Sequence, residues 1–587
     1  MSNRKHVINF VMIFVIGIAF LFLGLTLTFI FMRLMPGDPV LAYLPPTFTP
    51  AQYEAMRQYL GFDRPIIIQF LRFILDSLTG NWGLSSTISH GQPVWDLIGP
   101  RFSRTIEILA LPLIIAANIG YIFGRVSKRT ERNWLKMGIQ LLSAVCIAVP
   151  IFGFGMFLQY TLAYQVDLFP AIGYKSAAFP DPPLITGFRI LDSLISGQLY
   201  LALDTMLHYA LPMIILTVLF SALITRVVSS KMTEDAYKKK TILSNSAKTS
   251  GIFGIIITSL ILIDVTFNLN SIGSLIITAI THYDYYVIQG LMSVVIILFV
   301  LAIIVSNLIF SIITLIKDRK GKFVEVEEFT EREPDTTIVI DLKNYSKKLV
   351  RSPLTIIGVV AVLIPIILSI FAELISGYSY IEAMGFSSPS WAPPSPGHLL
   401  GTGAYGRDVL ARSLYGTGTS LLFGIGAVFL GLVGGLTLGL LSQLHRIIRI
   451  IIMSFTLVFY VLPGILIVLF LVGVLTPLPE LILIATGLLL IPIFTRIVAN
   501  AEFRIVPIGK KILAYIPLFM GFSILFYASL GFLGFTSPLT IQLGADVSAA
   551  RMHLYDAPWA AFWPGFMIFF ITVSLFILHE GLAKHSR

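Results

Sequence analysis

The sequence has few charged residues and only one cysteine. Asp, Glu, Lys and Arg make up 12% of its 587 residues, about half the share of a soluble domain, whereas 56% are hydrophobic. A soluble core could not bury this much apolar surface, so lipid must be the solvent for most of the chain. Because Cys146 stands alone, an intrachain disulfide and a cysteine-based metal site are both excluded.

The common motifs of catalysis and nucleotide binding are also missing. The sequence has no phosphate-binding G-x-x-x-x-G-K-[ST] loop, no His-Glu-x-x-His pattern and no nucleophile elbow. Its nine histidines are scattered. We therefore expect no enzyme, no cofactor and no metal ion bound by this chain. The net charge of +10 does not indicate nucleic acid, because the basic residues fall between apolar runs, as topology signals do.

Long apolar runs dominate what is present, and each is long enough to cross a bilayer. Backbone polar groups cannot be left bare in lipid, so these runs must be helices. The sequence therefore predicts an all-α membrane protein with about twelve spans. The runs are Phe10–Met32, Thr105–Gly124, Met137–Ala163, Tyr209–Val228, Ile252–Leu269, Tyr286–Ile316, Leu354–Ile375, Ser420–Leu441, Ile450–Val474, Leu481–Ala499, Ile512–Leu533 and Ala561–Leu578.

A charged stretch divides these runs into two sets of six. Residues 317–352 are rich in both acidic and basic residues, and we interpret them as a linker between a first domain, 1–316, and a second, 353–587. The other Lys- and Arg-rich loops alternate with poorer ones, which predicts that the linker and both termini are cytoplasmic. The long loop 33–104 would then lie outside the cell membrane. Its segment Ile66–Leu78 fits either a helix lying in the lipid interface or part of a small external subdomain.

A few residues inside the apolar runs are candidates for lining a translocation path. Pro150 and Pro463 interrupt backbone hydrogen bonding and can kink helices around a cavity. Asp264 is flanked by apolar residues on both sides, so it either forms a helix-packing hydrogen bond or lines a pore.

Similar segments close the two sets of runs. Tyr283-Asp284 precedes the last run of the first set, and Tyr555-Asp556 precedes the last run of the second. The same order of parts in both sets suggests two homologous domains related by a pseudo-twofold axis.

Two further stretches resemble a known family. The first is RLMPGDPV, Arg33–Val40, which contains Pro36, Gly37, Asp38 and Pro39. It resembles the turn after the first helix in one permease subunit of the dipeptide/oligopeptide/nickel class of ABC importers. His398–Gly424 resembles the partner subunit. Its matching residues include Gly401, Thr402, Gly406, Arg407 and Asp408.

The resemblance implies two fused six-helix permease domains of the type I importer fold. It further implies two ABC ATPase subunits at the cytoplasmic face, which would bind the ATP, and an extracellular solute-binding protein. Peptides would be the cargo, with nickel complexes and oligosaccharides left open. The residues implied to contact the ATPases are Glu234, Asp235, Ala236 and Tyr237 in the first domain and Glu502, Arg504 and Lys510 in the second.

This sequence departs from the family in those same inner loops. Residues 238–250 have lost the Ala and Gly pattern, and residues 496–517 are shortened. Two other interpretations therefore stand beside the permease. One is a self-contained secondary carrier, which shares the layout of two sets of spans. The other is a degenerate permease that acts as a scaffold.

Overall fold

The computed structural model describes residues 2–584 apart from 36, 230–241, 320–351, 387–388, 460–462, 476–477, 500–504 and 538. Within these residues the chain is helical, and its extended segments form only isolated bridges. We call the helices up to residue 319 the first half and those from residue 353 the second half.

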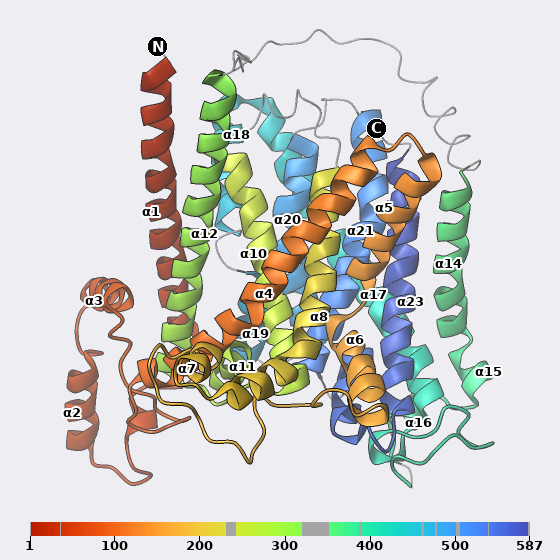
Figure 1. Ribbon diagram of the computed structural model, residues 1–587, viewed down its shortest axis with the longest axis horizontal. Helices are drawn as coiled ribbons and strands as arrows, with labels where there is room; N and C mark the ends of the chain where they lie inside the picture. Colours follow the sequence, from red (N-terminus) through yellow and green to blue (C-terminus); the bar gives the residue numbers. More distant parts are fainter. Residues whose placement is uncertain are drawn as a thin grey trace.

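Each half is built from five long helices and several shorter ones (Figure 1). In the first half the long helices are α1 (Ser2–Leu34), α4 (Val94–Arg129), α8 (Leu199–Ser229), α10 (Ile242–Phe267) and α12 (Tyr285–Arg319). The shorter ones are α2 (Pro50–Leu60), α3 (Ile66–Thr79), α5 (Asn133–Ala148), α6 (Ile151–Leu158), α7 (Arg189–Ile195) and α11 (Ile272–Thr281), with the turns η1 (Leu41–Tyr43) and η2 (Gln159–Gln165).

The second half repeats this order of parts. Its long helices are α14 (Pro353–Ile370), α17 (Val409–Leu444), α20 (Pro479–Ala499), α21 (Ile505–Phe532) and α23 (Trp559–Ala583). Its shorter helices are α15 (Ala372–Ser376), α16 (Tyr380–Met384), α18 (Arg446–Val458), α19 (Gly464–Leu475) and α22 (Leu543–Ala550), with the turns η3 (Ala404–Gly406) and η4 (Arg551–His553).

Within the described residues, fewer helices than the twelve predicted spans are long and apolar enough to cross a membrane. Ten described helices are long and apolar enough to cross a membrane, and α5 with the helix after it adds an eleventh if that bent pair counts as one span. The predicted run Met137–Ala163 is not straight, because it bends by 88° at the break before Ile151. The predicted run Ile450–Val474 is also wrong as a single helix, since it is divided into α18 and α19 on either side of 460–462.

The two ends of the bundle differ. The start of α1 and the end of α23 lie together at one end, which we call the termini end (Figure 1). Helices α2, α3, α7, α11, α15 and α16 lie at the opposite end, which we call the loop-rich end. This agrees with the prediction that both termini share one side of the membrane. That this side is the cytoplasmic one stays a prediction, and the linker at 320–351 lies outside the described residues.

The helix predicted in the first long loop forms as α3. It is seen nearly end-on in Figure 1 while α1 runs up the page, so it lies across the direction of the spans. Phe73 packs against Phe29 of α1, with ring centroids 5.7 Å apart. On its other side Leu71 and Leu75 are both 61% exposed. An exposed apolar face of this kind suits the interface between lipid headgroups and acyl chains.

Glycines hold the central helix pair of each half close together. In the second half, Gly435 and Gly439 of α17 face α20 so closely that an added Cβ would lie 2.3 Å and 2.6 Å from side-chain carbons. In the first half, Gly120 and Gly124 of α4 meet α8 in the same way, at 2.6 Å and 2.5 Å. Counted from Val94 and Val409, where α4 and α17 begin, these glycines occupy matching positions. The two halves therefore share the positions of these glycines as well as the order of their helices.

The first long loop is fastened to α12 through Asp284. The Oδ2 of this buried carboxylate accepts hydrogen bonds from Ser85 Oγ at 2.6 Å and from the backbone N–H groups of residues 86–88 at 3.0–3.1 Å. Burial by itself raises the pKa of the Asp284 carboxyl, but these hydrogen bonds outweigh it and hold the pKa below its usual value. The fastening is therefore strongest when Asp284 is ionised.

We expect Asp284→Asn to lower the free energy of unfolding at pH 7 by about 1–3 kcal/mol, because an amide cannot accept all these bonds. Since the pKa is lower in the folded state, the contribution of Asp284 is complete above about pH 4 and is lost as the pH falls through the folded-state pKa. Denaturant unfolding of the purified chain in detergent measures the difference. The control is Asp556→Asn, at the corresponding exposed residue before α23. Equal losses in both variants would contradict the assignment.

Candidate functional site

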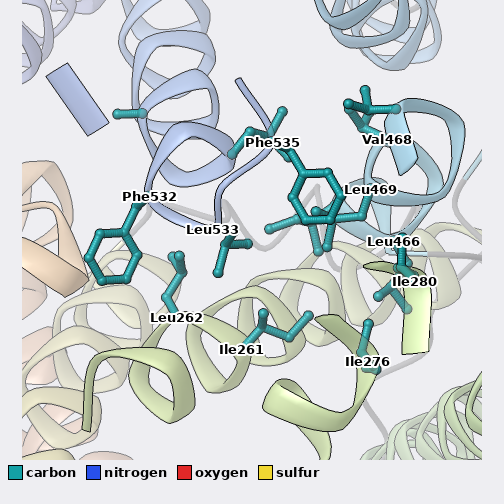
Figure 2. Packing of buried hydrophobic residues seen from close by; sticks show 14 of the residues in the cluster. Ile261, Leu262, Ile276, Ile280, Leu466, Val468, Leu469, Phe532, Leu533 and Phe535 are labelled. Carbon is teal, nitrogen blue, oxygen red and sulfur yellow. The ribbon is translucent and has the colours of Figure 1, made fainter. Parts of the chain in front are cut away.

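The two halves meet through a layer of apolar side chains, which we call the apolar seal (Figure 2). The first half contributes residues from α10 and α11, and the second half contributes α19 and the end of α21. None of these side chains is more than 7% exposed. The seal consists of Ile261, Leu262, Ile276, Ile280, Leu466, Val468, Leu469, Phe532, Leu533 and Phe535.

The seal is a barrier to polar solutes. Moving an amide or a charged group from water into an apolar layer without hydrogen-bond partners costs several kcal/mol. A constriction lined only by such side chains also tends to exclude water. In this conformation, a route between the halves is closed at the level of the seal.

A glycine sets how closely the seal can shut. Gly473 of α19 approaches Ile280 of α11 so closely that a Cβ built on Gly473 would lie 2.3 Å from the Ile280 Cγ2 atom. Any larger residue at Gly473 must therefore displace the Ile280 side chain. Nearby, the rings of Phe152 of α6 and Phe532 of α21 stack with centroids 4.5 Å apart, which adds a second contact between the halves.

Both prolines predicted to line a path stand at breaks in the helices that meet the other half. Pro150 lies between α5 and α6, at the 88° bend, and α6 packs against α23. Pro463 lies directly before α19, which packs against α10 and α11. Proline ends a helix because it lacks the N–H group and clashes with the preceding turn. The third predicted run of each half is thus interrupted near a proline.

The break at Pro150 leaves a backbone carbonyl to be satisfied from outside the helix. Ala148 is the last residue of α5, and its carbonyl oxygen lies 2.9 Å from Thr572 Oγ1 of α23. This hydroxyl also lies within hydrogen-bond distance of the Ile568 carbonyl of its own helix. An unpaired carbonyl in a membrane is costly, so the contact ties the broken span to the second half.

Two further polar contacts join the halves. Near the termini end, Arg226 of α8 forms an ion pair with Glu580 of α23 at 2.6 Å, and Arg226 Nε also donates to Ser143 of α5. Near the loop-rich end, Arg551 Nη1 of η4 donates to the Val265 carbonyl of α10 at 2.7 Å. The halves are therefore in contact both at the apolar seal and through these polar contacts.

Asp264 is held by the backbone of the next helix. Its side chain is 1% exposed and accepts hydrogen bonds from the N–H groups of Ser271 and Ser274, at the start of α11. Because a carboxylate satisfies N–H groups that a helix start leaves free, Asp264 fixes α11 beside the seal. Of the two sequence-based alternatives, this geometry matches the packing hydrogen bond.

The family-motif residues form well-ordered loops at the loop-rich end. Asp38 accepts hydrogen bonds from Tyr53 Oη and the Val40 N–H, and Gly37 and Pro39 flank it. Pro36 lies outside the described residues. Neither Asp38 nor its flanking residues belong to the apolar seal.

Within the second motif, His398–Gly424, Gly401 takes a φ of +75°, which suits glycine. Its Cβ position would lie 2.5 Å from Trp559 Nε1, and this nitrogen donates to the Thr402 carbonyl. Asp408 caps α17 by accepting from the Ala411 N–H at 2.7 Å.

The other residues of this motif also make contacts that stabilise the loop. Gly406 takes a φ of +71°, and the Arg407 guanidinium lies over the rings of Phe386 and Tyr405. These contacts position the start of α17 and α23. In this structure, the motif residues therefore hold the loops of the loop-rich end in place.

The residues implied to contact ATPases are mostly beyond what the structure describes. Glu234, Asp235, Ala236, Tyr237, Glu502 and Arg504 all lie outside the described residues. Lys510 is described and lies near the start of α21, partly exposed. Among the described residues, no group of three or more His, Cys, Asp or Glu side chains could hold a metal ion.

Sequence reasoning missed the seal and the glycine contacts. The seal consists of ordinary Ile, Leu, Val and Phe residues, which the sequence does not distinguish from those that face lipid. The glycines carried a usable signal, because Gly431, Gly435 and Gly439 recur every fourth residue within one apolar run. This spacing is typical of closely packed membrane helices.

Known proteins with a similar sequence align with about half of this chain. No family model matches it. The chain is 27% identical to a probable peptide ABC transporter permease of Sinorhizobium fredii, over 49% of this chain and 91% of that protein. It is 28% and 26% identical to the dipeptide transport system permeases of Alkalihalophilus pseudofirmus and Escherichia coli K12, in each case over 50% of this chain and 93% of the relative. Half of this chain thus accommodates nearly a whole relative.

We expect Gly473→Leu to open the seal, because the new side chain must displace Ile280. The variant should melt at a lower temperature than wild type and should let a small fluorescent dye leak from proteoliposomes. Ile280→Ala in the same chain makes room for the leucine and should restore much of both properties. Since the two residues are in contact, their effects should be clearly non-additive. Additive effects would contradict this account of the seal.

Proposed function

We propose that this chain, a permease component of a peptide ABC importer, carries both halves of the translocation path in one polypeptide. The relatives cover about half of the chain, and their names state that they transport peptides or dipeptides. The other half has the same order of long helices. Two domains, 1–316 and 353–587, joined by the linker 317–352, would therefore form the pair that separate subunits form elsewhere.

The observation that best supports this proposal is the matching position of glycines in the two halves. Gly120 and Gly124 correspond to Gly435 and Gly439 along α4 and α17, and both pairs bring their helices into close contact with the neighbouring helix. Such a correspondence follows from a duplicated or fused permease fold. It has no reason to arise in two unrelated sets of spans.

In the proposed mechanism, the path runs between the halves and the seal closes it. Two ABC ATPase subunits bind at the cytoplasmic termini end, near 230–241 and 500–504, and hydrolyse ATP. A solute-binding protein delivers the peptide at the extracellular loop-rich end. Rocking of the halves about the breaks at Pro150 and Pro463 would part α19 from α11. The chain itself needs no bound cofactor for these movements.

The decisive experiment is reconstitution. The chain is purified with its native ATPases and placed in proteoliposomes with the solute-binding protein, and uptake of labelled dialanine is measured. We expect uptake that requires ATP and that disappears when the ATPases lack their catalytic residue.

Two other results would replace the proposal. Uphill uptake by this chain alone under an ion gradient would identify a secondary carrier. Stable binding of ATPases without any stimulation of ATP hydrolysis would identify a scaffold. The scaffold is considered because the two inner loops differ in length. Only residues 500–504 separate α20 from α21, whereas residues 230–241 separate α8 from α10.

We also expect the halves to remain associated when the linker is cut. A protease site inserted after Asp335 allows cleavage of the purified protein, and size-exclusion chromatography then reports whether the fragments stay together. The seal and the Arg226–Glu580 ion pair should hold them in one complex. Glu580→Gln serves as a matched variant, which should weaken the cleaved complex more than the intact chain. Separation of the wild-type fragments would show that the linker, and not the interface, joins the halves.

A further inference from the structure

A pocket of about 430 Å³ opens at the loop-rich end of the first half, and we call it the Arg101 pocket. Its walls come from the loop before α4, from α4 itself, from the loop after η2, from the turn between α10 and α11, and from α11. Its lining includes the cations Arg101 and Lys175 and no acidic side chain. The remaining lining residues are Ile88, Gly173, Tyr174, Ala177, Asn268, Asn270, Ser274, Leu275 and Thr278.

Two arginines give this pocket its charge. Arg101 donates from Nε to Asn270 Oδ1 at 3.0 Å and from Nη1 to the Leu97 carbonyl at 2.8 Å. Behind it, Arg104 donates to the Asn270 carbonyl at 2.6 Å and lies over the ring of Tyr174. Within the described residues, neither arginine forms an ion pair. A guanidinium has five N–H donors, so Arg101 retains donors for a ligand.

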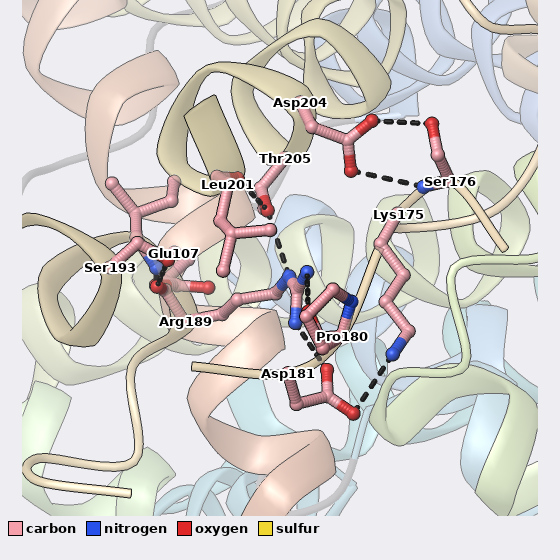
Figure 3. A network of polar contacts seen from close by, with 11 residues as sticks. Glu107, Lys175, Ser176, Pro180, Asp181, Arg189, Ser193, Leu201, Asp204 and Thr205 are labelled. Atoms are coloured by element: carbon pink, nitrogen blue, oxygen red, sulfur yellow. Dashed lines mark hydrogen bonds and ion pairs between the residues drawn. The ribbon is translucent and has the colours of Figure 1, made fainter. Parts of the chain in front are cut away.

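The opposite wall is held in place by a network of polar contacts (Figure 3). Lys175 Nζ pairs with Asp181 at 2.8 Å, and Arg189 contacts the same carboxylate. Asp204 of α8 accepts from the N–H group of Ser176 at 3.0 Å. Lys175 and Arg189 share the Asp181 carboxylate, and the network fixes the loop that carries Tyr174. Of the two cations that line the pocket, Lys175 is ion-paired, whereas Arg101 forms no ion pair with any described residue, so Arg101 is the cation available to a ligand.

The pocket and the seal share one helix. Ser274, Leu275 and Thr278 of α11 line the pocket, whereas Ile276 and Ile280 of the same helix belong to the seal. An occupant of the pocket would therefore bind directly beside the helix that must move when the seal opens.

The second half has a pocket at the same end, but its charge is different. This pocket is smaller, about 210 Å³, and contains Arg407, Arg412 and Asp546. Arg412 forms an ion pair with Asp546 at 2.6 Å. One of its two arginines is therefore neutralised within the pocket. Of these two pockets, only the Arg101 pocket has an arginine and no acidic side chain among its described lining residues.

We propose that the Arg101 pocket binds the terminal carboxylate of a peptide as it arrives at the seal. The inference rests on the proposed function. Guanidinium groups bind carboxylates through paired, charge-assisted hydrogen bonds, which distinguishes a free terminus from an amidated one. The carboxylate would bind to Arg101, and the last residues of the peptide would lie against α11.

The test uses the full chain alone, so its result does not depend on ATPase coupling. Thr278→Cys is introduced in a Cys146→Ser background, and the rates of modification by anionic and cationic methanethiosulfonate reagents are compared. We expect the anionic reagent to be favoured and expect Arg101→Gln to lower the ratio of the two rates about tenfold. Arg101→Lys should keep most of the preference. Arg407→Gln, in the other pocket, should leave the ratio unchanged.

Peptide binding is then read from protection of the same cysteine. Dialanine at roughly 10 mM, enough to fill a millimolar site, should slow modification, whereas dialanine amide should not. Protection by dialanine should disappear in Arg101→Gln. This comparison of two ligands on one protein remains valid if the arginine variant folds poorly. Equal protection by both compounds, or none by dialanine, would overturn the proposal even where ATP-driven uptake is confirmed.

Discussion

Close packing at small residues is the constraint on which this structure depends. Lipid tails are as apolar as leucine, so helices in a bilayer gain little from the hydrophobic effect and must associate through van der Waals contact. Gly120 and Gly124 permit this contact in the first half, and Gly435 and Gly439 permit it in the second. The pairs α4–α8 and α17–α20 are therefore the fixed parts of the two halves. The broken helices can then act as the moving parts against them.

The interface between the halves is built differently from these fixed pairs. Its centre is an apolar layer, and its described polar contacts include two toward the ends, at Arg226–Glu580 and at Arg551 with the Val265 carbonyl, and one from the middle of α23, at Thr572 with the Ala148 carbonyl. An apolar layer has no directional bonds to break, so the halves can separate and close again. Polar contacts at the ends give the closed arrangement a defined register. This combination suits an interface that opens repeatedly.

Most of the fold could be predicted from the sequence because spans have a minimum length and must satisfy their own backbone. The bend at Pro150 and the division between α18 and α19 could not, because proline only permits a break and tertiary contacts decide its angle. Asp264 was ambiguous for the same reason. Its partners, Ser271 and Ser274, come near only once α11 has folded back. The seal residues carry no signal that separates them from lipid-facing residues.

The contact between Thr572 and the Ala148 carbonyl has a consequence for hydration. When α5 and α23 separate, this oxygen loses its partner from the other half, and hydrocarbon has no donor to replace it. Water is the available substitute, so the open arrangement must admit water as far as the broken span. The balance between closed and open forms should then depend on osmotic pressure, because each opening takes up solvent that each closure expels.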